Sequence, residues 1–254
     1  MNHYVNQLQV ITEESLISFI TCPYKFYYEF LEKKKRPYDW RQIVQHVVNK
    51  VVSSYYQVPI EQRHSGKVLS LIEFYWDKVS PQIFESRIQY YLVVAKMTDC
   101  LIQYLTTETK QIPPLFLFKR FNTYVEELDV DLSLTFDVAE WSESSFVIKK
   151  YLLEATPEML DLYFHLSIVF SEKVLKRSPQ RMEVVTLMDG KKHVFHPTVG
   201  DIEEGLTYLQ GMKLLIEDSS GYVKNHNENE CPVCPFQSIC DRDGRKASPK
   251  KYYS

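Results

Sequence analysis

The chain has 254 residues, of which 44% are hydrophobic and 25% are charged, and these ordinary globular values exclude a disordered or fibrous protein. The formal net charge is −3, which excludes a protein that coats nucleic acid by bulk charge but allows a local basic groove. Only 7 glycines are present, and neither the dinucleotide-binding nor the P-loop glycine motif occurs, so those enzyme classes are disfavoured.

Targeting signals are absent from the sequence pattern. No apolar run approaches the roughly 20 residues needed to span a bilayer. The first ten residues lack a charged segment followed by an apolar one, so they do not resemble a secretory signal. We therefore expect a cytoplasmic protein that makes no contact with a membrane. In that compartment its 5 cysteines are expected to be metal ligands or core residues rather than disulfides.

The first half of the chain predicts helices. Residues 13–32 have apolar side chains at helical spacing, Thr12 can cap their start, and Cys22-Pro23 predicts a break between two helices. Together with the later helices, these residues form an expected N-terminal helical portion over residues 12–112. The later helices are predicted over residues 41–57, 67–79 and 83–108.

The pattern changes at Pro113-Pro114. Alternating residues predict strands from Leu115 to Leu153 with a turn at Ser142–Ser145, and Asp189-Gly190 predicts the turn of a later hairpin. The expected architecture is one domain over residues 1–254, with a mixed α/β core and no doubly wound sheet. Within it, helices are predicted over residues 157–175 and 198–217, the core spans residues 113–217, and a cysteine-rich and basic tail spans residues 218–254.

Three cysteines in the tail predict a metal centre. Cys231, Cys234 and Cys240 are spaced so that their sulfurs can converge, and a four-ligand site needs one more cysteine. We favour Cys22, beside a proline at a helix break, over Cys100, which lies inside an amphipathic helix as a small hydrophobe. The spacing alone favours iron–sulfur only modestly over zinc.

Several segments together resemble a known family. The segment ESLISFITCPYKFYYEFL, a helix with Gln45-His46, a set of strands and the closing CPVCPFQSIC resemble the RecB-like branch of the PD-(D/E)XK nucleases. The likeness is greatest to the iron–sulfur nuclease domain of AddB-type helicase–nuclease subunits and to CRISPR-adaptation nucleases. It implies a restriction-endonuclease-like core with a small mixed β-sheet flanked by helices. It also implies a 4Fe-4S cluster held by Cys22, Cys231, Cys234 and Cys240. Such a cluster would join the first helices to the C-terminal tail.

The same resemblance implies a nuclease centre, and two departures from the family motif predict that this centre is degraded. In the family, acids and a histidine hold Mg²⁺ or Mn²⁺, and a lysine stabilises charge at the reacting phosphate. The acid that should precede the lysine by two residues is replaced by Ile148, and the glutamine of the last motif is replaced by Met159. The residues that match the motif are His46, Asp137, Lys150 and Tyr163.

One carboxylate and one histidine bind a hard cation weakly, so we expect little cleavage. The expected role is DNA binding, or scaffolding in a repair, recombination or defence complex, with a DNA strand or end and a helicase or other protein subunit as partners. Two alternatives stay open. One is an active divalent-metal-dependent DNA exonuclease with a migrated acid, for which Glu154 and Asp161 are the candidates. The other is a protein-interaction scaffold that does not bind nucleic acid.

The remaining charged residues have both a functional and an ordinary interpretation. Lys33–Arg36 can contact phosphate, or can simply complement a helix C-terminus. Without the family resemblance, a histidine at the position of His46 on an apolar helix is more often a core histidine, and Asp137 can be a turn former at the end of a strand. His193 and His196 are expected on the surface. The tail cations are candidate phosphate contacts that supply affinity rather than sequence choice, and they are Arg242, Arg245, Lys246, Lys250 and Lys251.

Overall fold

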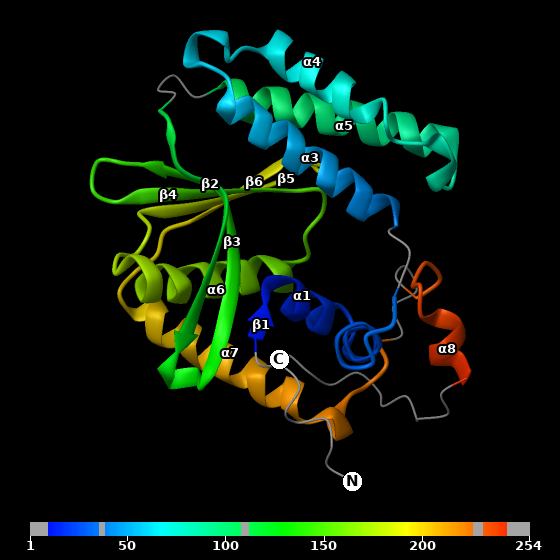
Figure 1. Cartoon of the computed structure of the whole chain (residues 1–254), viewed down its shortest axis with the longest axis vertical. Helices are drawn as coiled ribbons and strands as arrows, with labels where there is room; N and C mark the ends of the chain where they lie inside the picture. Colours follow the sequence, from blue (N-terminus) through cyan, green and yellow to red (C-terminus); the bar gives the residue numbers. More distant parts are fainter. Residues whose placement is uncertain (1–9, 36–38, 108–111, 226–230, 243–254) are drawn as a thin grey trace.

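A mixed β-sheet with helices on both faces forms the centre of the computed structural model (Figure 1). The structure describes residues 10–35, 39–107, 112–225 and 231–242. The predicted fold class, a mixed α/β protein whose sheet is flanked by helices, is therefore confirmed. Within these ranges, no helix is long and apolar enough to cross a membrane.

The sheet is organised around its longest shared strand, β3. One edge of β3 pairs with β2 in antiparallel fashion along most of its length. The other edge is divided between β1, which runs parallel to residues 131–133, and β4, which runs antiparallel to residues 138–141. Beyond β4 follow β5 and the edge strand β6. The strands are β1 (Val10–Thr12), β2 (Pro114–Val125), β3 (Val130–Trp141), β4 (Phe146–Leu152), β5 (Arg181–Thr186) and β6 (Lys191–Phe195).

The helices form two layers, one on each face of the sheet (Figure 1). Helices α1, α6 and α7 pack on one face, whereas α3, α4 and α5 lie over the other. A π-helical turn (Tyr27–Leu31) follows α2, and α8 lies in the tail. The helices are α1 (Glu13–Thr21), α2 (Pro23–Phe26), α3 (Trp40–Gln57), α4 (Ser65–Trp76), α5 (Arg87–Thr106), α6 (Pro157–Leu175), α7 (Gly200–Glu217) and α8 (Gln237–Arg242).

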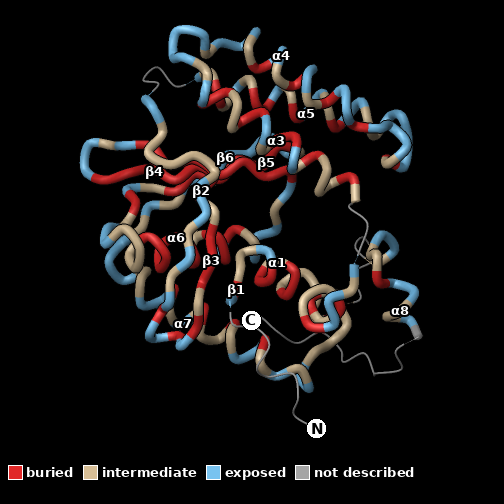
Figure 2. The backbone as a smooth tube through the Cα atoms, in the orientation of Figure 1, coloured by how far each residue is buried: buried red, intermediate tan, exposed pale blue. Residues whose placement is uncertain are grey.

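Two hydrophobic cores result from this sandwich. Phe136, Ile148 and Leu166 belong to the core on the α6 side, and Val48 and Tyr151 belong to the core on the α3 side. Every residue of β4 is buried, because a strand covered on both faces has no solvent side. Figure 2 shows the buried central strands between more exposed outer helices.

Local sequence signals account for most element boundaries. Thr12 caps α1 as predicted, since its hydroxyl accepts a hydrogen bond from Ser15 N at 3.1 Å. The predicted break at Cys22 is also confirmed, because that residue is extended between α1 and α2. The expected strand run over residues 115–153 is interrupted by a further turn at Glu126–Leu128, which Asp129 closes with φ 47°. Strand β1 was not anticipated.

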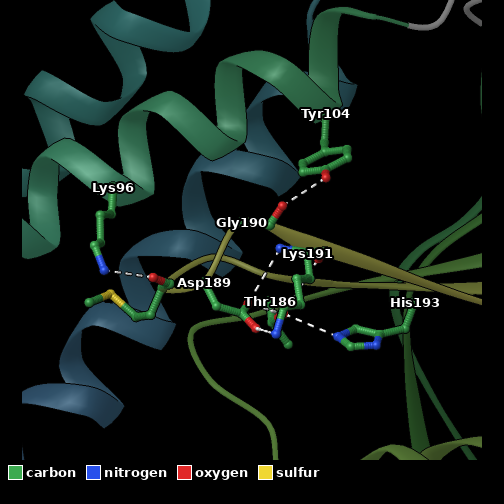
Figure 3. Close-up of polar contacts among 8 residues, drawn as sticks. Lys96, Tyr104, Thr186, Asp189, Gly190, Lys191 and His193 are labelled. Atoms are coloured by element: carbon green, nitrogen blue, oxygen red, sulfur yellow. Dashed lines mark hydrogen bonds and ion pairs between the residues drawn. The ribbon is translucent and has the colours of Figure 1, made fainter.

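The predicted hairpin at Asp189-Gly190 is present and is fixed against α5 (Figure 3). Gly190 has φ 68°, a conformation that glycine adopts without steric cost. The Lys96 ammonium donates to the Met188 carbonyl at 2.9 Å, and the Tyr104 hydroxyl donates to the Gly190 carbonyl at 2.9 Å. The turn that joins β5 and β6 is thus anchored to α5, in the layer formed by α3, α4 and α5.

Helices α6 and α7 approach closely at Gly205, which gives a first prediction. A Cβ at Gly205 would lie 2.9 Å from Val169 Cγ2 and 3.3 Å from the His165 carbonyl, whereas one at Gly211 of the same helix would meet nothing within 4 Å. We expect Gly205→Ala to lower the free energy of unfolding by about 1–3 kcal/mol through overpacking. The matched Gly211→Ala should leave it unchanged or raise it by up to about 1 kcal/mol. Urea unfolding measures both, and equal stabilities for the two variants would contradict the close approach.

Candidate functional site

The candidate site lies where β1 and β4 part along their shared edge of β3. Strand β1 pairs only as far as Ser133, and β4 begins to pair at Val138. Asp137 precedes that first pair. On the other edge of β3, Phe118 of β2 falls between the pairs Leu117–Val138 and Lys119–Phe136, and it has φ 45°. The gap between the two strands leaves room for side chains from α1 and α6.

Four side chains from four elements meet in this gap. Lys150 of β4 places its Nζ 2.7 Å from Glu13 Oε1 and 3.3 Å from Asp137 Oδ1. The same Nζ lies 4.7 Å from the centre of the Tyr163 ring of α6. The side chains of Lys150, Glu13 and Asp137 are only 10%, 12% and 8% exposed. We call Glu13, Asp137, Lys150 and Tyr163 the Lys150 cluster.

Hydrogen bonds to the backbone and between side chains hold the cluster in place. The Tyr151 N–H donates to the Asp137 carboxylate, and the Tyr163 hydroxyl donates to the Glu13 carboxylate. Gln45 of α3 reaches the same strand from the other face. Its Nε2 donates to the Tyr151 carbonyl at 2.8 Å, and its Oε1 accepts from Leu153 N at 2.7 Å. The end of β4 is therefore clamped on both sides.

Burial dominates the electrostatics of the cluster. It raises the pKa of Glu13 and of Asp137 above their ordinary values, although Lys150 opposes the shift in both. Burial alone would lower the pKa of Lys150, but Asp137 and Glu13 together raise it above its ordinary value. The pKa of Tyr163 is raised by burial and by the Glu13 charge. Two carboxylates thus share one cation, and the surplus negative charge is disfavoured.

Apolar residues surround the position of the missing acid. Ile148 pairs with Ala139 on one side and with Met182 on the other. All three are buried in the core beneath α6, with Ile148 only 3% exposed. Residues two apart share a strand face, so Ile148 faces the same layer as Lys150. The position is therefore a packed part of the core with no carboxylate.

Some expected site residues do not join the cluster. The structure brings Asp137, Lys150 and Tyr163 together, but His46 is exposed on α3. Its neighbour Gln45 contacts the sheet instead. Valines of α3 at helical spacing pack against the core, and a turn of about 100° per residue puts His46 on the far side of that stripe.

The two migrated acids considered from the sequence also lie elsewhere. Glu154 is at the surface, where it binds Arg41 with a Nε–Oε2 distance of 3.1 Å, and Asp161 is exposed on α6. The second acid of the cluster is instead Glu13, which the sequence pattern did not single out. Its position depends on β1, a three-residue strand that pairs with a partner about 120 residues away, so no local pattern marks it.

The five cysteines lie in two regions of the structure. Cys22, Cys234 and Cys240 pack against one aromatic group, and Asn225 ties the tail to α1 by donating to the Thr21 carbonyl at 2.8 Å. The Cys234 N–H donates to the Cys231 carbonyl at 3.2 Å and closes a turn between these two cysteines. Cys100 is buried in the core between α3 and α5. All five thiols are free, and the aromatic group comprises Tyr24, Tyr28 and Phe236.

The chemistry of the tail thiols suits a sulfur-ligated metal. Burial raises the pKa of Cys234, the nearby Cys22 and Cys231 thiols add to this shift, and the Lys25 charge opposes it. However, no three histidine, cysteine or acidic side chains within the described part of the chain are arranged as a metal site. The cysteines therefore fit a sulfur-ligated metal by residue type alone, and metal binding there stays a prediction.

Of the two basic segments, the structure describes Lys33–Lys35 but not the charged end of the tail. Lys33 and Lys35 are exposed, whereas Lys34 pairs with Glu32 at 3.4 Å and lies over the Tyr28 ring. Of the expected surface histidines, His196 is exposed, and His193 is half-buried with its Nε2 3.3 Å from the Thr186 hydroxyl (Figure 3). Arg36 and the tail cations Arg245, Lys246, Lys250 and Lys251 lie outside the described residues, as does the Arg242 side chain.

Comparison with known proteins supports the fold class. The sequence matches no protein-family model and no curated protein. Among solved structures, the chain is similar to a "putative exonuclease" from Eubacterium rectale, with a TM-score of 0.51 and 9% sequence identity. The match covers 96% of this chain and 91% of that one. At this identity the likeness concerns the fold alone, and the conclusion is that this chain shares the overall fold of that structure.

The raised pKa of Glu13 predicts how stability depends on pH. The unfolded chain releases this proton near pH 4.5, whereas the folded chain holds it to higher pH. The folded state of the wild type should therefore lose stability as pH rises from about 4.5 through the raised value. Glu13→Gln should remove the Glu13 part of this decline and leave the part that comes from Asp137, whose pKa is also raised, so the variant gains stability relative to wild type as pH increases. Urea unfolding between pH 4 and 8 measures both slopes.

Glu14→Gln is the matched control, because Glu14 is the exposed neighbour of Glu13 on the same helix. Its pH dependence should follow that of the wild type. Lys150→Met gives an independent check, since it strands two buried carboxylates and should cost about 3–5 kcal/mol. Identical pH slopes for wild type and Glu13→Gln would mean that Glu13 is solvated rather than buried in the cluster.

Proposed function

We propose that this protein handles DNA through a nuclease-like fold whose cleavage centre is closed. The observation that carries this proposal is the contact of one lysine, Lys150, with both acids of the site at 2.7 and 3.3 Å. In an active metal-dependent centre, carboxylates bind the cation and the lysine is free to act on phosphate. Here the lysine neutralises the carboxylates itself.

The apolar packing at Ile148 supports the same proposal. Magnesium and manganese favour several oxygen ligands, and two carboxylates already paired with an ammonium compete poorly for them. A further acid cannot enter from β4, because the position two residues before Lys150 is occupied by Ile148 in a packed core. His46, exposed on α3, does not supply a ligand from its side.

The proposed role without cleavage is to bind a DNA strand or end within a repair, recombination or defence complex. The similarity in fold to a structure named as a putative exonuclease supports a role on nucleic acid. Exposed Lys33 and Lys35 are suitable phosphate contacts, and such contacts supply affinity without sequence choice. A helicase or another protein subunit is the proposed partner. A scaffold that never touches DNA is distinguished from this role by a salt-dependent binding titration.

A second candidate function follows from Glu13. Glu13 and Asp137 approach one lysine from two elements, so a divalent cation that displaced Lys150 would find two carboxylates. Lys150 would then be released to stabilise charge on a phosphate. This arrangement would give an active metal-dependent DNA exonuclease whose second acid comes from α1.

Digestion of labelled single-stranded and duplex DNA with Mg²⁺ or Mn²⁺ tests the two candidates. We expect the wild type to show little or no metal-dependent cleavage, because both acids are engaged by Lys150. We also expect it to bind DNA with an affinity that falls as salt rises. Cleavage that is lost in Glu13→Gln and Asp137→Asn but kept in Glu14→Gln would establish the active alternative. Cleavage that survives all three substitutions would indicate a contaminating enzyme.

The tail is proposed to hold a 4Fe-4S cluster through Cys22, Cys231, Cys234 and Cys240. When bound, such a cluster would supply a covalent link between the α1–α2 junction and the tail rather than DNA chemistry. The packing of three of these thiols on Tyr24, Tyr28 and Phe236 supports this set of ligands. A ligand set that joins residues about 210 apart restricts the unfolded chain strongly, so metal binding should contribute to folding.

Cysteine substitutions test this ligand set by metal analysis. Protein purified without oxygen should be brown and contain about four irons per chain. Cys22→Ser should lower the iron content and the thermal stability, because ligand binding energy is also folding energy. Cys100→Ser is the matched control and should keep the iron. If the protein contains zinc and no iron, the site is a zinc site and the proposal of a 4Fe-4S cluster is wrong. If Cys100→Ser loses the iron and Cys22→Ser keeps it, Cys22 is not the fourth ligand.

A further inference from the structure

A cavity opens at the turn between α4 and α5, at the end of the upper helical layer that lies toward α8 in Figure 1. Its volume is about 580 Å³, within the range of sites that bind small molecules. All of its lining residues come from one stretch of the chain, residues 80–91. The cavity lies in the α3–α5 layer, on the other side of the sheet from the helices that carry Glu13 and Tyr163.

Aromatic side chains form the wall of this cavity. Phe84 and Tyr90 meet edge to face with ring centres 5.3 Å apart, and Tyr90 contacts Tyr91 in the same way at 5.2 Å. Trp76 packs behind both Phe84 and Tyr90, at 6.1 and 5.3 Å, and Trp40 of α3 supports Phe84 at 5.3 Å. The wall is thus held rigidly, while Tyr91 is 65% exposed and offers a ring for stacking.

Polar groups converge on the same cavity. Arg87 lines it from the first turn of α5 and makes no ion pair with any residue that the structure describes. The Ser80 and Ser86 hydroxyls line it too, and each accepts a backbone hydrogen bond that leaves its own hydrogen to donate. The positive end of a 20-residue helix adds to the attraction for an anion.

One buried donor of the wall also lacks an acceptor. Trp76 is 6% exposed, and its indole N–H has no hydrogen-bond partner among the described residues. An unsatisfied buried donor is unusual in a folded protein, and it lies in the ring cluster that backs the cavity.

We propose that this cavity binds a nucleotide, with the base stacked on Tyr91 and the phosphate held by Arg87. Aromatic stacking and a cation are the two elements by which proteins hold unpaired nucleotides. A free guanidinium and a helix N-terminus favour a phosphate-bearing ligand over an apolar side chain of a protein. As a site for an unpaired nucleotide at a DNA end, the proposal rests on the proposed DNA-handling function.

Calorimetric titration of the full chain with thymidine 5′-monophosphate tests the proposal. Tyr91→Ala should weaken binding about tenfold, as expected for the loss of one stacked base. Arg87→Gln should weaken binding of the monophosphate but not of thymidine, whereas Arg87→Lys should retain part of the preference. Tyr124→Ala and Lys50→Gln are the controls, since they remove an exposed tyrosine and an exposed lysine elsewhere, and both should bind as the wild type does.

The other outcomes separate this proposal from the proposed function. No binding of the monophosphate by a protein that still binds single-stranded DNA would overturn the nucleotide cavity and leave DNA handling intact. Binding of the monophosphate without any binding of DNA would keep the cavity and overturn its assignment to a DNA end. If N-acetyltyrosinamide binds as tightly as the monophosphate, the cavity accepts a protein side chain and the nucleotide proposal fails.

Discussion

The burial of Lys150 between two carboxylates is the constraint on which the site depends. Each of these groups is costly to bury alone, because a charge in a low-dielectric interior loses its hydration. Their mutual contacts at 2.7 and 3.3 Å offset that cost, and the ring of Tyr163 completes the enclosure. The cluster is stable only if α1, β3, β4 and α6 keep their relative positions, so these elements must form as one unit.

This constraint also gives a reason for the shortest strand of the sheet. Strand β1 has three residues, too few to be stable by their own ladder, but it delivers the start of α1 to the gap beside β4. The Thr12 cap fixes where the helix begins, and Glu13 is its first residue. The carboxylate then lies at the positive end of the helix, where a negative charge is favoured. Strand β1 has little stability of its own, but it places the Glu13 carboxylate where it pairs with Lys150.

Sequence patterns predicted the local features well and the non-local ones poorly. The Thr12 cap, the break at Cys22 and the Asp189-Gly190 hairpin depend on a few adjacent residues, and each is present. The burial of Ile148 was also predictable, since strand periodicity alone puts it on the face of Lys150. Glu13 was not predictable, because its role depends on a parallel pairing across the chain.

The placement of His46 is a different kind of miss. The information was present in the sequence, since the valine stripe of α3 at helical spacing already puts His46 on the outer side and Gln45 at the edge of the buried side. The expectation of a metal ligand at His46 came instead from its match to the histidine of the family motif. The clamp of Gln45 on the backbone of β4 shows what the position beside the motif histidine does here, which is to hold a strand rather than a metal.

The closed Lys150 cluster leaves the proposed DNA contacts to other parts of the molecule. Its charged side chains are 8–12% exposed, so a phosphate cannot reach them without opening the gap between β1 and β4. Any contact with DNA must therefore use groups outside the cluster, such as the exposed lysines after the π-helical turn or Arg87 at the α5 end. These groups belong to other elements than those that enclose Lys150. Substitutions at such surfaces can change affinity for DNA while the buried ion pairs, and the folding that depends on them, stay as they are.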